Sequence, residues 1–441
     1  MTAFPIESNT LMLKNAGIRV TLVCLVAASV GLSVAIISIS KVLLVITLSL
    51  VLLRGNRAVP SRAALQETLT PLLATIIALV FIVSLLWTSA PLNSALGAVG
   101  KYGKFLLIPA LLVLVQSRRE AAYALAFFLG AQFSLLLGSW GLYFHVPVPW
   151  ATSNMATTAY AVFSSYLDQG IMSAVAAAVF WHLRSLASNR FVRWVAILVS
   201  VVALGCVFVV FTGRTGHLVG IAVLSLAFFF ALPRKYRLAS LLVPPLMLVV
   251  VFFSFEKVAQ GFFAVKAEIS SHSAKFDPQS SSGVRLNFWK TSVEAIVERP
   301  LMGSGAGSWV TEYNRIEQQK NPLHQSLGPQ SHGNPHQEFL LWGVQLGVGG
   351  ILLLFAFGGA VLLDLRKMEP PIARAGQSVL LALAVSCLFN SSLYDAYIGD
   401  FFCVSLGVLL AYGFHSREAS GGSVVEGVVQ HLKNEDPLIK I

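Results

Sequence analysis

The sequence predicts an all-α, polytopic membrane protein with about twelve transmembrane helices and a large, partly helical loop on the outer side of the membrane. Three observations support this fold class. Of the 441 residues, 56% are hydrophobic and only 12% are charged, whereas a soluble domain has roughly 25% charged residues. The mean hydropathy is +0.74. Apolar runs of about 18 or more residues recur along the chain, and each can cross a bilayer as a helix.

The apolar runs give twelve expected spans, separated by short polar segments. In chain order they cover about 18–35, 37–53, 69–88, 103–116, 121–144, 168–187, 194–212, 216–232, 238–255, 337–363, 375–392 and 396–414. The chain thus divides into residues 1–255 with spans one to nine, an outer loop at 256–336, residues 337–415 with the last three spans, and a tail at 416–441. We expect the first span to be uncleaved, because the run continues without a clear cleavage motif.

Lysine and arginine are distributed unevenly between the two sides of this topology. Segments on the side of the amino terminus hold 19 of them, whereas the short segments on the other side hold only Lys41, Lys101, Lys104 and Arg214. Because loops rich in Lys and Arg stay in the cytoplasm, we expect both termini there. The basic residues lie between apolar runs and form no single patch, so the net charge of +11 does not indicate a nucleic-acid binder.

The outer loop is expected to contain one helix. From Val284 to Glu298 the apolar residues follow helical spacing, and Pro300 ends the run. Such an amphipathic helix is typical of one that lies on or near a bilayer surface. The stretches Ser270–Ser282 and Asn321–Gly333 are rich in Ser, Gln, Pro and Gly, and we expect them to be mobile.

Acidic residues are scarce in the middle of the expected spans. Glu338 and Asp364 lie at span ends, and Asp400 lies near the start of the twelfth span. Because ion-coupled transporters generally need ionisable groups at mid-membrane, this pattern disfavours a transporter. The polar chemistry is expected at the outer rim instead.

Two arginines at the outer rim are candidates for binding an anion. Arg214 lies in the turn Thr212–Gly216 between two spans, where the other outer turns have almost no arginine. Arg285 lies at the start of the expected loop helix, just after Ser282, which can cap that helix. A guanidinium group and a helix amino terminus both suit phosphate. The alternative is an ordinary turn for Arg214 and a solvated helix face for Arg285.

A helix start precedes the tenth span. Asn334 fits the N-cap, Pro335 the first helical position and Gln337 a capping box, so His336 would lie in the first turn. The helix dipole there disfavours a charged imidazole, so His336 could accept a proton near neutral pH. The alternative role is a capping histidine.

Other polar residues at the outer side are weaker candidates. A zinc site built from His324, His332 and His336 is disfavoured, because Gly333 and Pro335 break the regular face that paired ligands need. The remaining candidates, each also explained as a cap or an interfacial anchor, are Asp168, Asp395, Lys101, Lys104 and His332. The run Gly303–Gly307 lacks the lysine of a nucleotide-binding loop, so we expect no nucleotide.

Several of these motifs together resemble the O-antigen ligase (WaaL) family, within the superfamily of O-antigen ligases, O-antigen polymerases and protein O-oligosaccharyltransferases. The resemblance rests on the turn Thr212–Gly216, on Gly283–Leu286 leading through Trp289 to Glu298–Gly305, and on Asn334–His336. It covers residues 205–345 well. Elsewhere only the topology agrees.

The resemblance implies a lipid-linked-donor glycosyltransferase of the GT-C-like type in the bacterial inner membrane, inverting and independent of metal and cofactor. It would transfer a glycan from undecaprenyl diphosphate to lipid A-core at the periplasmic face during lipopolysaccharide biosynthesis. Arg214 and Arg285 would bind and neutralise the donor diphosphate, His336 would accept the proton of the acceptor hydroxyl or orient that hydroxyl, and Asp395 is a candidate supporting acid. The alternatives are a polymerase or a protein O-oligosaccharyltransferase of the same superfamily, a lipid-linked oligosaccharide transporter, or an assembly scaffold.

Overall fold

The computed structural model describes residues 6–53, 67–246, 281–322 and 333–435, and every regular element within them is a helix. In chain order the helices are α1 (Ile6–Ser29), α2 (Val34–Leu53), α4 (Thr70–Val83), α5 (Leu92–Tyr102), α6 (Leu107–Leu114), α7 (Arg118–Tyr143), α8 (Ala156–Ala159), α9 (Tyr166–Leu183), α10 (Arg190–Gly205), α11 (Arg214–Ala231), α14 (Ser281–Glu298), α15 (Trp309–Lys320), α16 (Glu338–Leu365), α17 (Pro370–Phe389) and α18 (Ala396–Glu435). Short turns extend or join them: η1 (Ser84–Leu86), η2 (Gly103–Leu106), η3 (Arg184–Leu186), η4 (Cys206–Val210) and η5 (Arg234–Leu242).

Seven helices in the described part of the chain are long and apolar enough to cross a membrane. They are Leu92–Leu114, Arg118–Tyr143, Arg190–Val210, Arg214–Ala231, Glu338–Leu365, Pro370–Phe389 and Ala396–Arg417, and three shorter apolar helices are Gly17–Ser29, Val34–Leu50 and Thr70–Leu86. The protein is therefore an all-helical, polytopic membrane protein, as predicted. The number twelve stays a prediction, because half of the expected span at 238–255 lies outside the described residues. Both stretches expected to be mobile also lie largely outside them.

One expected span boundary was wrong. The fourth span begins at Leu92, earlier than the expected residue 103, because α5, η2 and α6 join into one apolar segment. The tail expected from residue 416 continues α18 as helix to Glu435.

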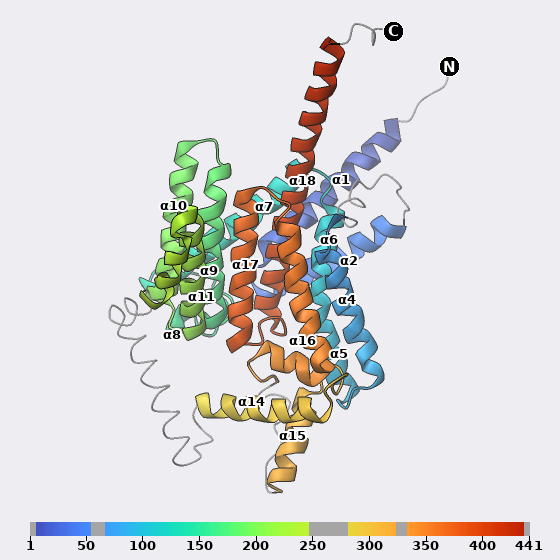
Figure 1. Ribbon diagram of the computed structural model, residues 1–441, viewed down its shortest axis with the longest axis vertical. Helices are drawn as coiled ribbons and strands as arrows, with labels where there is room; N and C mark the ends of the chain where they lie inside the picture. The colour runs from blue at the N-terminus through green and yellow to red at the C-terminus, as the bar shows by residue number, and fades with distance from the viewer. Residues whose placement is uncertain (1–5, 54–66, 247–280, 323–332, 436–441) are drawn as a thin grey trace.

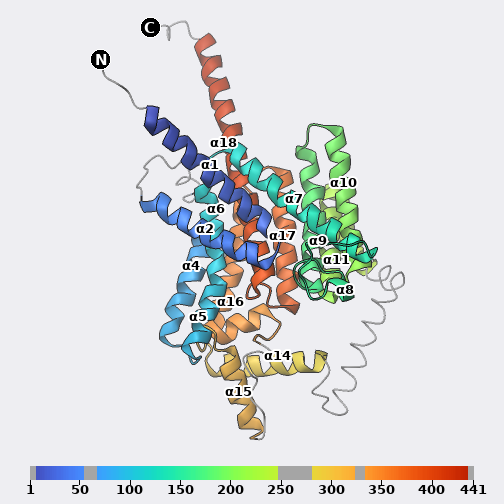
Figure 2. The same ribbon diagram turned by 180° about the vertical axis from the view of Figure 1, so that it is seen from behind.

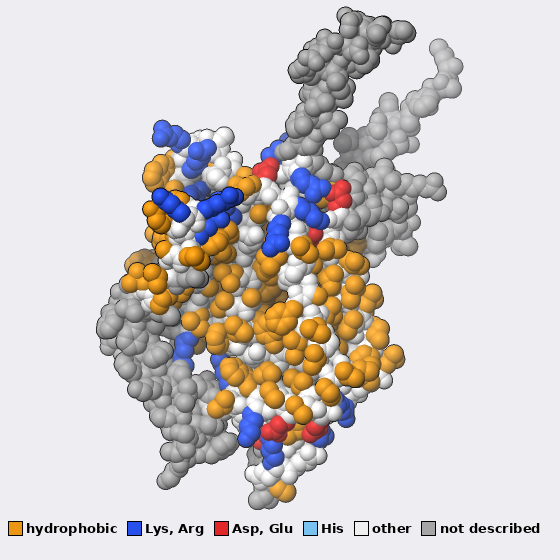
Figure 3. Space-filling view, in the orientation of Figure 1, with side chains coloured by type: hydrophobic (Ala, Val, Ile, Leu, Met, Phe, Trp, Pro, Cys, Tyr) orange, Lys and Arg blue, Asp and Glu red, His pale blue; other side chains and the backbone are white. Residues whose placement is uncertain are grey.

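The charged side chains of the bundle gather at its two ends. α1 begins and α18 ends at the same end, as an even number of crossings requires (Figures 1 and 2). We call this the terminal end, and the opposite end, where α14 and α15 lie, the loop end (Figure 1). Figure 3 shows a belt of hydrophobic side chains between them. A belt of this kind is the surface that a membrane-spanning bundle presents to lipid.

Helix α9 lies in the interior of the bundle. Its side chains are small and almost all buried, and it packs against α10, α11 and α17. α9 and α11 approach closely at Gly170 and Gly216, since a Cβ atom on Gly216 would lie 3.2 Å from the Cα atom of Gly170. This close crossing, which larger side chains would prevent, brings the amino-terminal ends of both helices together at the loop end.

The span expected at 337–363 is present as α16, but its helix is broken at Gly347. Gly347 has φ 66° and ψ −161°, a conformation that only glycine adopts readily, and it breaks the helix there. A turn of the outer loop packs against this break. The backbone N–H of Val348 donates to the carbonyl of Pro300 (2.7 Å), and the backbone N–H of Ser304 donates to the carbonyl of Val344 (2.8 Å).

The glycines after Pro300 serve packing. Gly303, Gly305 and Gly307 all have positive φ. A Cβ atom would lie 2.6 Å from the backbone of Gln345 at Gly303 and 2.3 Å from the Cα atom of Thr88 at Gly305. The run Gly303–Gly307 therefore joins α14 and α15 to the break in α16.

The expected helix of the outer loop is present as α14, and it is followed by a helix that was not expected. α14 buries Phe288 and Ala295 against α15 and α16, while Val293 and Val297 of the expected apolar set are exposed. α15 was missed in the sequence, although Trp309, Tyr313 and Ile316 follow helical spacing and are buried.

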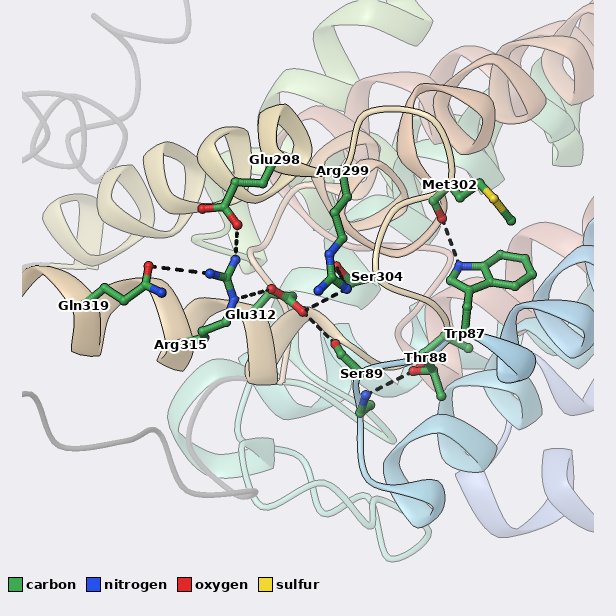
Figure 4. A network of polar contacts seen from close by, with 12 residues as sticks. Trp87, Thr88, Ser89, Glu298, Arg299, Met302, Ser304, Glu312, Arg315 and Gln319 are labelled. Carbon is green, nitrogen blue, oxygen red and sulfur yellow. Dashed lines mark hydrogen bonds and ion pairs between the residues drawn. The ribbon is translucent and has the colours of Figure 1, made fainter.

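A network around Glu312 holds α15 in place (Figure 4). The carboxylate of Glu312 is buried, accepts hydrogen bonds from Ser89 (2.7 Å) and Arg315 (2.8 Å), and lies 3.8 Å from Arg299. Burial raises the pKa of Glu312, but the hydrogen bonds from Ser89 and Arg315 and the charges of both arginines outweigh it and lower the pKa below the usual 4.5.

This lowered pKa predicts an acid-sensitive contribution to stability. The contribution is present above pH 4.5 and is lost as the pH falls through the lower pKa of the folded state, because protonation removes the charge that the arginines stabilise. We expect Glu312→Gln to lower the free energy of unfolding by about 1–3 kcal/mol at pH 7. Thermal unfolding in detergent at several pH values measures this, and the variant should lose less stability on acidification than the wild type.

Glu294→Gln provides the control, since Glu294 forms a more exposed pair with Lys320 (2.6 Å). Such a pair contributes about 0–1 kcal/mol. Equal acid sensitivity of the wild type and Glu312→Gln would contradict the assigned role of Glu312.

Candidate active site

The segment before α16 holds His336 in an unusual backbone conformation. His336 has φ 53°, in the left-handed region that few residues other than glycine adopt. Its backbone N–H donates to Oδ1 of Asn334 (2.9 Å), which closes a tight turn. Both Asn334 and Pro335 are buried, and His336 is half-buried. Backbone strain of this kind often occurs at functional sites.

The expected helix start was wrong by three residues. α16 begins at Glu338, and its N-cap is Gln337, whose side chain accepts a hydrogen bond from the backbone of Leu340 (2.5 Å). Asn334 cannot cap the helix, because its oxygen accepts from His336 and the left-handed turn at His336 interrupts the helical backbone. His336 therefore lies just before the helix and not in its first turn.

The indole of Trp289 connects this segment to α14. Its Nε1 donates to the carbonyl of Pro335 (3.0 Å), the residue before His336. Arg285 lies four residues before Trp289, on the same face of α14, and is half-buried. The contact thus brings the helix face that carries Arg285 to the segment that carries His336.

Glu338 is a site residue that the sequence analysis did not propose. Its side chain is fully buried, and it accepts hydrogen bonds from the indole of Trp342 (2.8 Å), the backbone of Leu393 (2.8 Å) and the backbone of Tyr394 (3.3 Å). The hydroxyl of Tyr102 lies 3.4 Å away. Glu338 thereby fixes the start of α16 to the turn between α17 and α18. The sequence signal that could have identified Glu338 is an acidic residue that directly follows a capping residue at the start of an apolar run.

Asp395 lies in that turn and faces the His336 segment. Nδ2 of Asn334 lies 3.5 Å from Oδ1 of Asp395. Burial raises the pKa of Asp395 above its usual value, although the positive charges of Lys104 and Lys101 oppose the rise. An aspartate placed in this way can hold or share a proton beside the turn of His336.

The two lysines approach Asp395 from η2 and the end of α5. Lys104 donates to the backbone carbonyl of Asp395 (2.5 Å), and Gly399 leaves room for its side chain. Lys101 lies over the ring of Tyr394, 3.6 Å from its centroid. Lys104 is only 4% exposed, so the expectation that it lies at an outer helix end was wrong. The cause is the continuous segment through α5, η2 and α6, in which Lys104 points inward.

Asp168 and Arg214 lie in the first turns of the neighbouring helices α9 and α11. Ser165 caps α9 by accepting from the backbone of Asp168 (3.1 Å). Asp168 is close enough to Asp395 for their charges to interact. Gly213, just before Arg214, fits against Leu167, since a Cβ atom there would lie 3.1 Å from the side chain of Leu167. Arg214 itself is exposed.

These contacts form one chain around the loop end. α11 packs against α9, and Asp168 of α9 is close enough to Asp395 for their charges to interact. Asp395 lies beside Asn334 in the turn of His336, and Trp289 connects that turn to α14. Within the described residues, Arg214 begins the helix that packs against α9, and Arg285 lies on the helix that Trp289 connects to the His336 segment. Figure 3 shows basic side chains in the space between the loop end of α11 and α14. His324 and His332 lie outside the described residues.

The described residues contain no group of three or more His, Cys, Asp or Glu side chains that could hold a metal ion. The zinc site that the sequence disfavoured needs His324 and His332, so it is not tested.

A comparison with protein families assigns part of this region. Residues 201–355 match the family model Wzy_C, described as O-antigen ligase. The match covers about a third of the chain and includes Arg214, Arg285, His336 and Glu338. No curated protein matches the chain in sequence.

Proposed function

We propose, from the premise that residues 201–355 form an O-antigen ligase domain, that this protein transfers a glycan from undecaprenyl diphosphate to lipid A-core at the periplasmic face of the bacterial inner membrane. Members of this family are enzymes that transfer glycans, and the domain implies transfer of the O-antigen ligase or polymerase type from a lipid-linked glycan. One observation carries the finer proposal: the domain contains both candidate arginines and His336, and Trp289 ties the helix of Arg285 to the turn of His336.

In the proposed reaction the acceptor hydroxyl attacks the anomeric carbon of the donor. A new C–O bond forms, the bond to the diphosphate breaks, and undecaprenyl diphosphate leaves with the electron pair. His336 takes the hydroxyl proton, and Asp395 stabilises the protonated imidazole. Arg214 and Arg285 neutralise the charge that grows on the leaving diphosphate, because guanidinium groups match phosphate oxygens. Lys101 and Asp168 contribute charge around this site, and Lys104 holds the turn of Asp395 through its backbone carbonyl.

Single-site variants of the arginines test the donor site. We expect Arg285→Ala to lower kcat/KM about 10²–10³-fold, because one lost charge-stabilising donor costs about that much. The assay uses purified full-length protein, an undecaprenyl-diphosphate glycan and lipid A-core, with a chelator present. Lys290→Ala is the matched control, since Lys290 is an exposed cation on the same helix.

The products distinguish the members of the superfamily. Glycan joined to lipid A-core supports the ligase, whereas longer lipid-linked glycan made without lipid A-core would identify a polymerase. Equal losses in Arg285→Ala and Lys290→Ala would contradict the donor site. Transport of the lipid-linked glycan without any transfer would support the transporter instead.

A further inference from the structure

A second cluster of basic side chains lies at the terminal end of the bundle, far along the chain from the residues proposed for catalysis. Arg184 follows α9, Arg237 lies in η5 and Arg374 lies near the start of α17. His182, in the last turn of α9, completes the group, which we call the basic cluster. α9, α11, α17 and η5 pack together here.

Aromatic rings of α11 bind the cluster together. The guanidinium of Arg374 lies 5.3 Å from the ring centroid of Phe230, and the ring of His182 lies 5.7 Å from the same centroid. The guanidinium of Arg237 lies 5.2 Å from the ring of Phe229, which contacts Phe230. Arginine stacked on a ring keeps its edge donors free to bind an anion.

The cluster carries positive charge without a matching carboxylate. The positive charges of Arg374 and Arg184 are close enough to repel each other. Other arginines of this protein are paired: Arg19 with Glu120, and Arg417 with Glu67. Within the described residues no carboxylate pairs with an arginine of the basic cluster.

Two buried nitrogen atoms in the cluster also have no hydrogen-bond partner among the described residues. They are Nε2 of His182, whose side chain is only 4% exposed, and Nε of Arg237. Nε of Arg237 is a donor, and Nε2 of His182 is a donor in one of its two neutral tautomers, so a ligand with several acceptor oxygens would stabilise this arrangement. A phosphate group supplies such oxygens.

The surroundings of the cluster suit a lipid. Phe228 and Leu238, on α11 and η5, are exposed apolar residues next to it. Figure 3 shows basic side chains at the terminal end directly above the hydrophobic belt. Basic pockets between membrane helices at this level bind anionic headgroups.

We propose that the basic cluster binds the phosphate of an anionic phospholipid in the leaflet at the terminal end. The acyl chains lie along the apolar surface of α11 and η5, and the phosphate accepts hydrogen bonds from Arg184, Arg374 and the buried nitrogens. The Lys and Arg bias assigns this leaflet to the cytoplasmic side. The lipid stabilises the packing of α9, α11 and α17, three helices that also reach the loop end.

Titration of lipid into the purified full-length protein tests the site. Phosphatidylglycerol should raise the midpoint of thermal unfolding of the wild type in a saturable way, because a ligand that binds only the folded state stabilises it. Inorganic phosphate and phosphatidylcholine should raise it much less. The variant R184Q/R374Q should bind phosphatidylglycerol at least about tenfold more weakly.

The control R190Q/R366Q removes the same charge from two exposed arginines at the same end and should respond like the wild type. Should R184Q/R374Q fail to fold, R237Q and R374K replace it, and both should weaken the response. An unchanged response in these variants would overturn the proposal. A wild type whose unfolding midpoint does not rise with phosphatidylglycerol would also overturn it. An equal rise with inorganic phosphate would overturn it too, because it would indicate a site for free anions.

Discussion

Replacing His336 by alanine should lower the rate of glycan transfer by about 10²–10⁴-fold, the contribution of a positioned general base. The imidazole is the proposed acceptor of the hydroxyl proton, and its turn is held by Asn334 and Trp289, so no neighbouring group can take its place without moving. Initial rates measured over a range of lipid A-core concentrations will show the effect. The loss should appear in kcat, because the base acts in the transition state.

His145→Ala is the matched control for that variant. His145 is an exposed histidine with φ 57°, at the end of α7, so alanine meets the same backbone strain there. It should transfer glycan at close to the wild-type rate. If His336→Ala inserts and unfolds normally yet retains transfer within a few-fold of the wild type, His336 is not the base.

Replacing Glu338 by alanine should lower the free energy of unfolding by about 3–5 kcal/mol, as expected when one partner of a buried charged network is removed. The substitution leaves the indole N–H of Trp342 and the backbone N–H groups of Leu393 and Tyr394 without their acceptor. Glu338→Gln keeps one carbonyl oxygen and should lose less. Thermal unfolding in detergent measures both.

Glu338 should also affect transfer, as a positioning residue for His336 and Asp395. A displacement of about 1 Å can cost 10²-fold in rate. At a temperature where the variants are folded, kcat should fall more than KM rises. Glu369→Gln, at the start of α17 with no side-chain capping bond, should change neither stability nor kcat. Loss of stability with unchanged kcat in Glu338→Gln would leave Glu338 a purely structural role.

The features predicted correctly from the sequence were those encoded in local patterns. The apolar runs predicted the membrane helices, and the spacing from Val284 predicted α14. The missed helix α15 shows the limit of this approach. Its apolar positions Trp309, Tyr313 and Ile316 lie within a polar segment, and its main anchor, Glu312, pairs with Ser89 far along the chain. A count of apolar residues along the sequence does not detect an anchor of this kind, because it depends on a contact between distant residues.

The errors at the site have a similar cause. The segment Asn334–Gln337 suits a helix capped by Asn334 as well as one capped by Gln337. The choice depends on whether the side chain of Asn334 accepts from the backbone of His336, as it does in the structure. Lys104 was expected at the outer end of a helix because the apolar run was predicted to begin at residue 103. In the structure Lys104 is buried and donates to the carbonyl of Asp395, a residue that lies beside it only after folding.

The sequence alone thus determined that this is a polytopic helical membrane protein and that its residues 201–355 match the O-antigen ligase family model. These properties follow from hydropathy, charge and motifs, all of which are local. The tertiary structure alone decided that Glu338 joins α16 to the turn of Asp395, that Gly347 divides an apolar run in two, and that Arg184, Arg237 and Arg374 meet. Each depends on contacts between helices distant in the chain, and such contacts are fixed only when side chains pack.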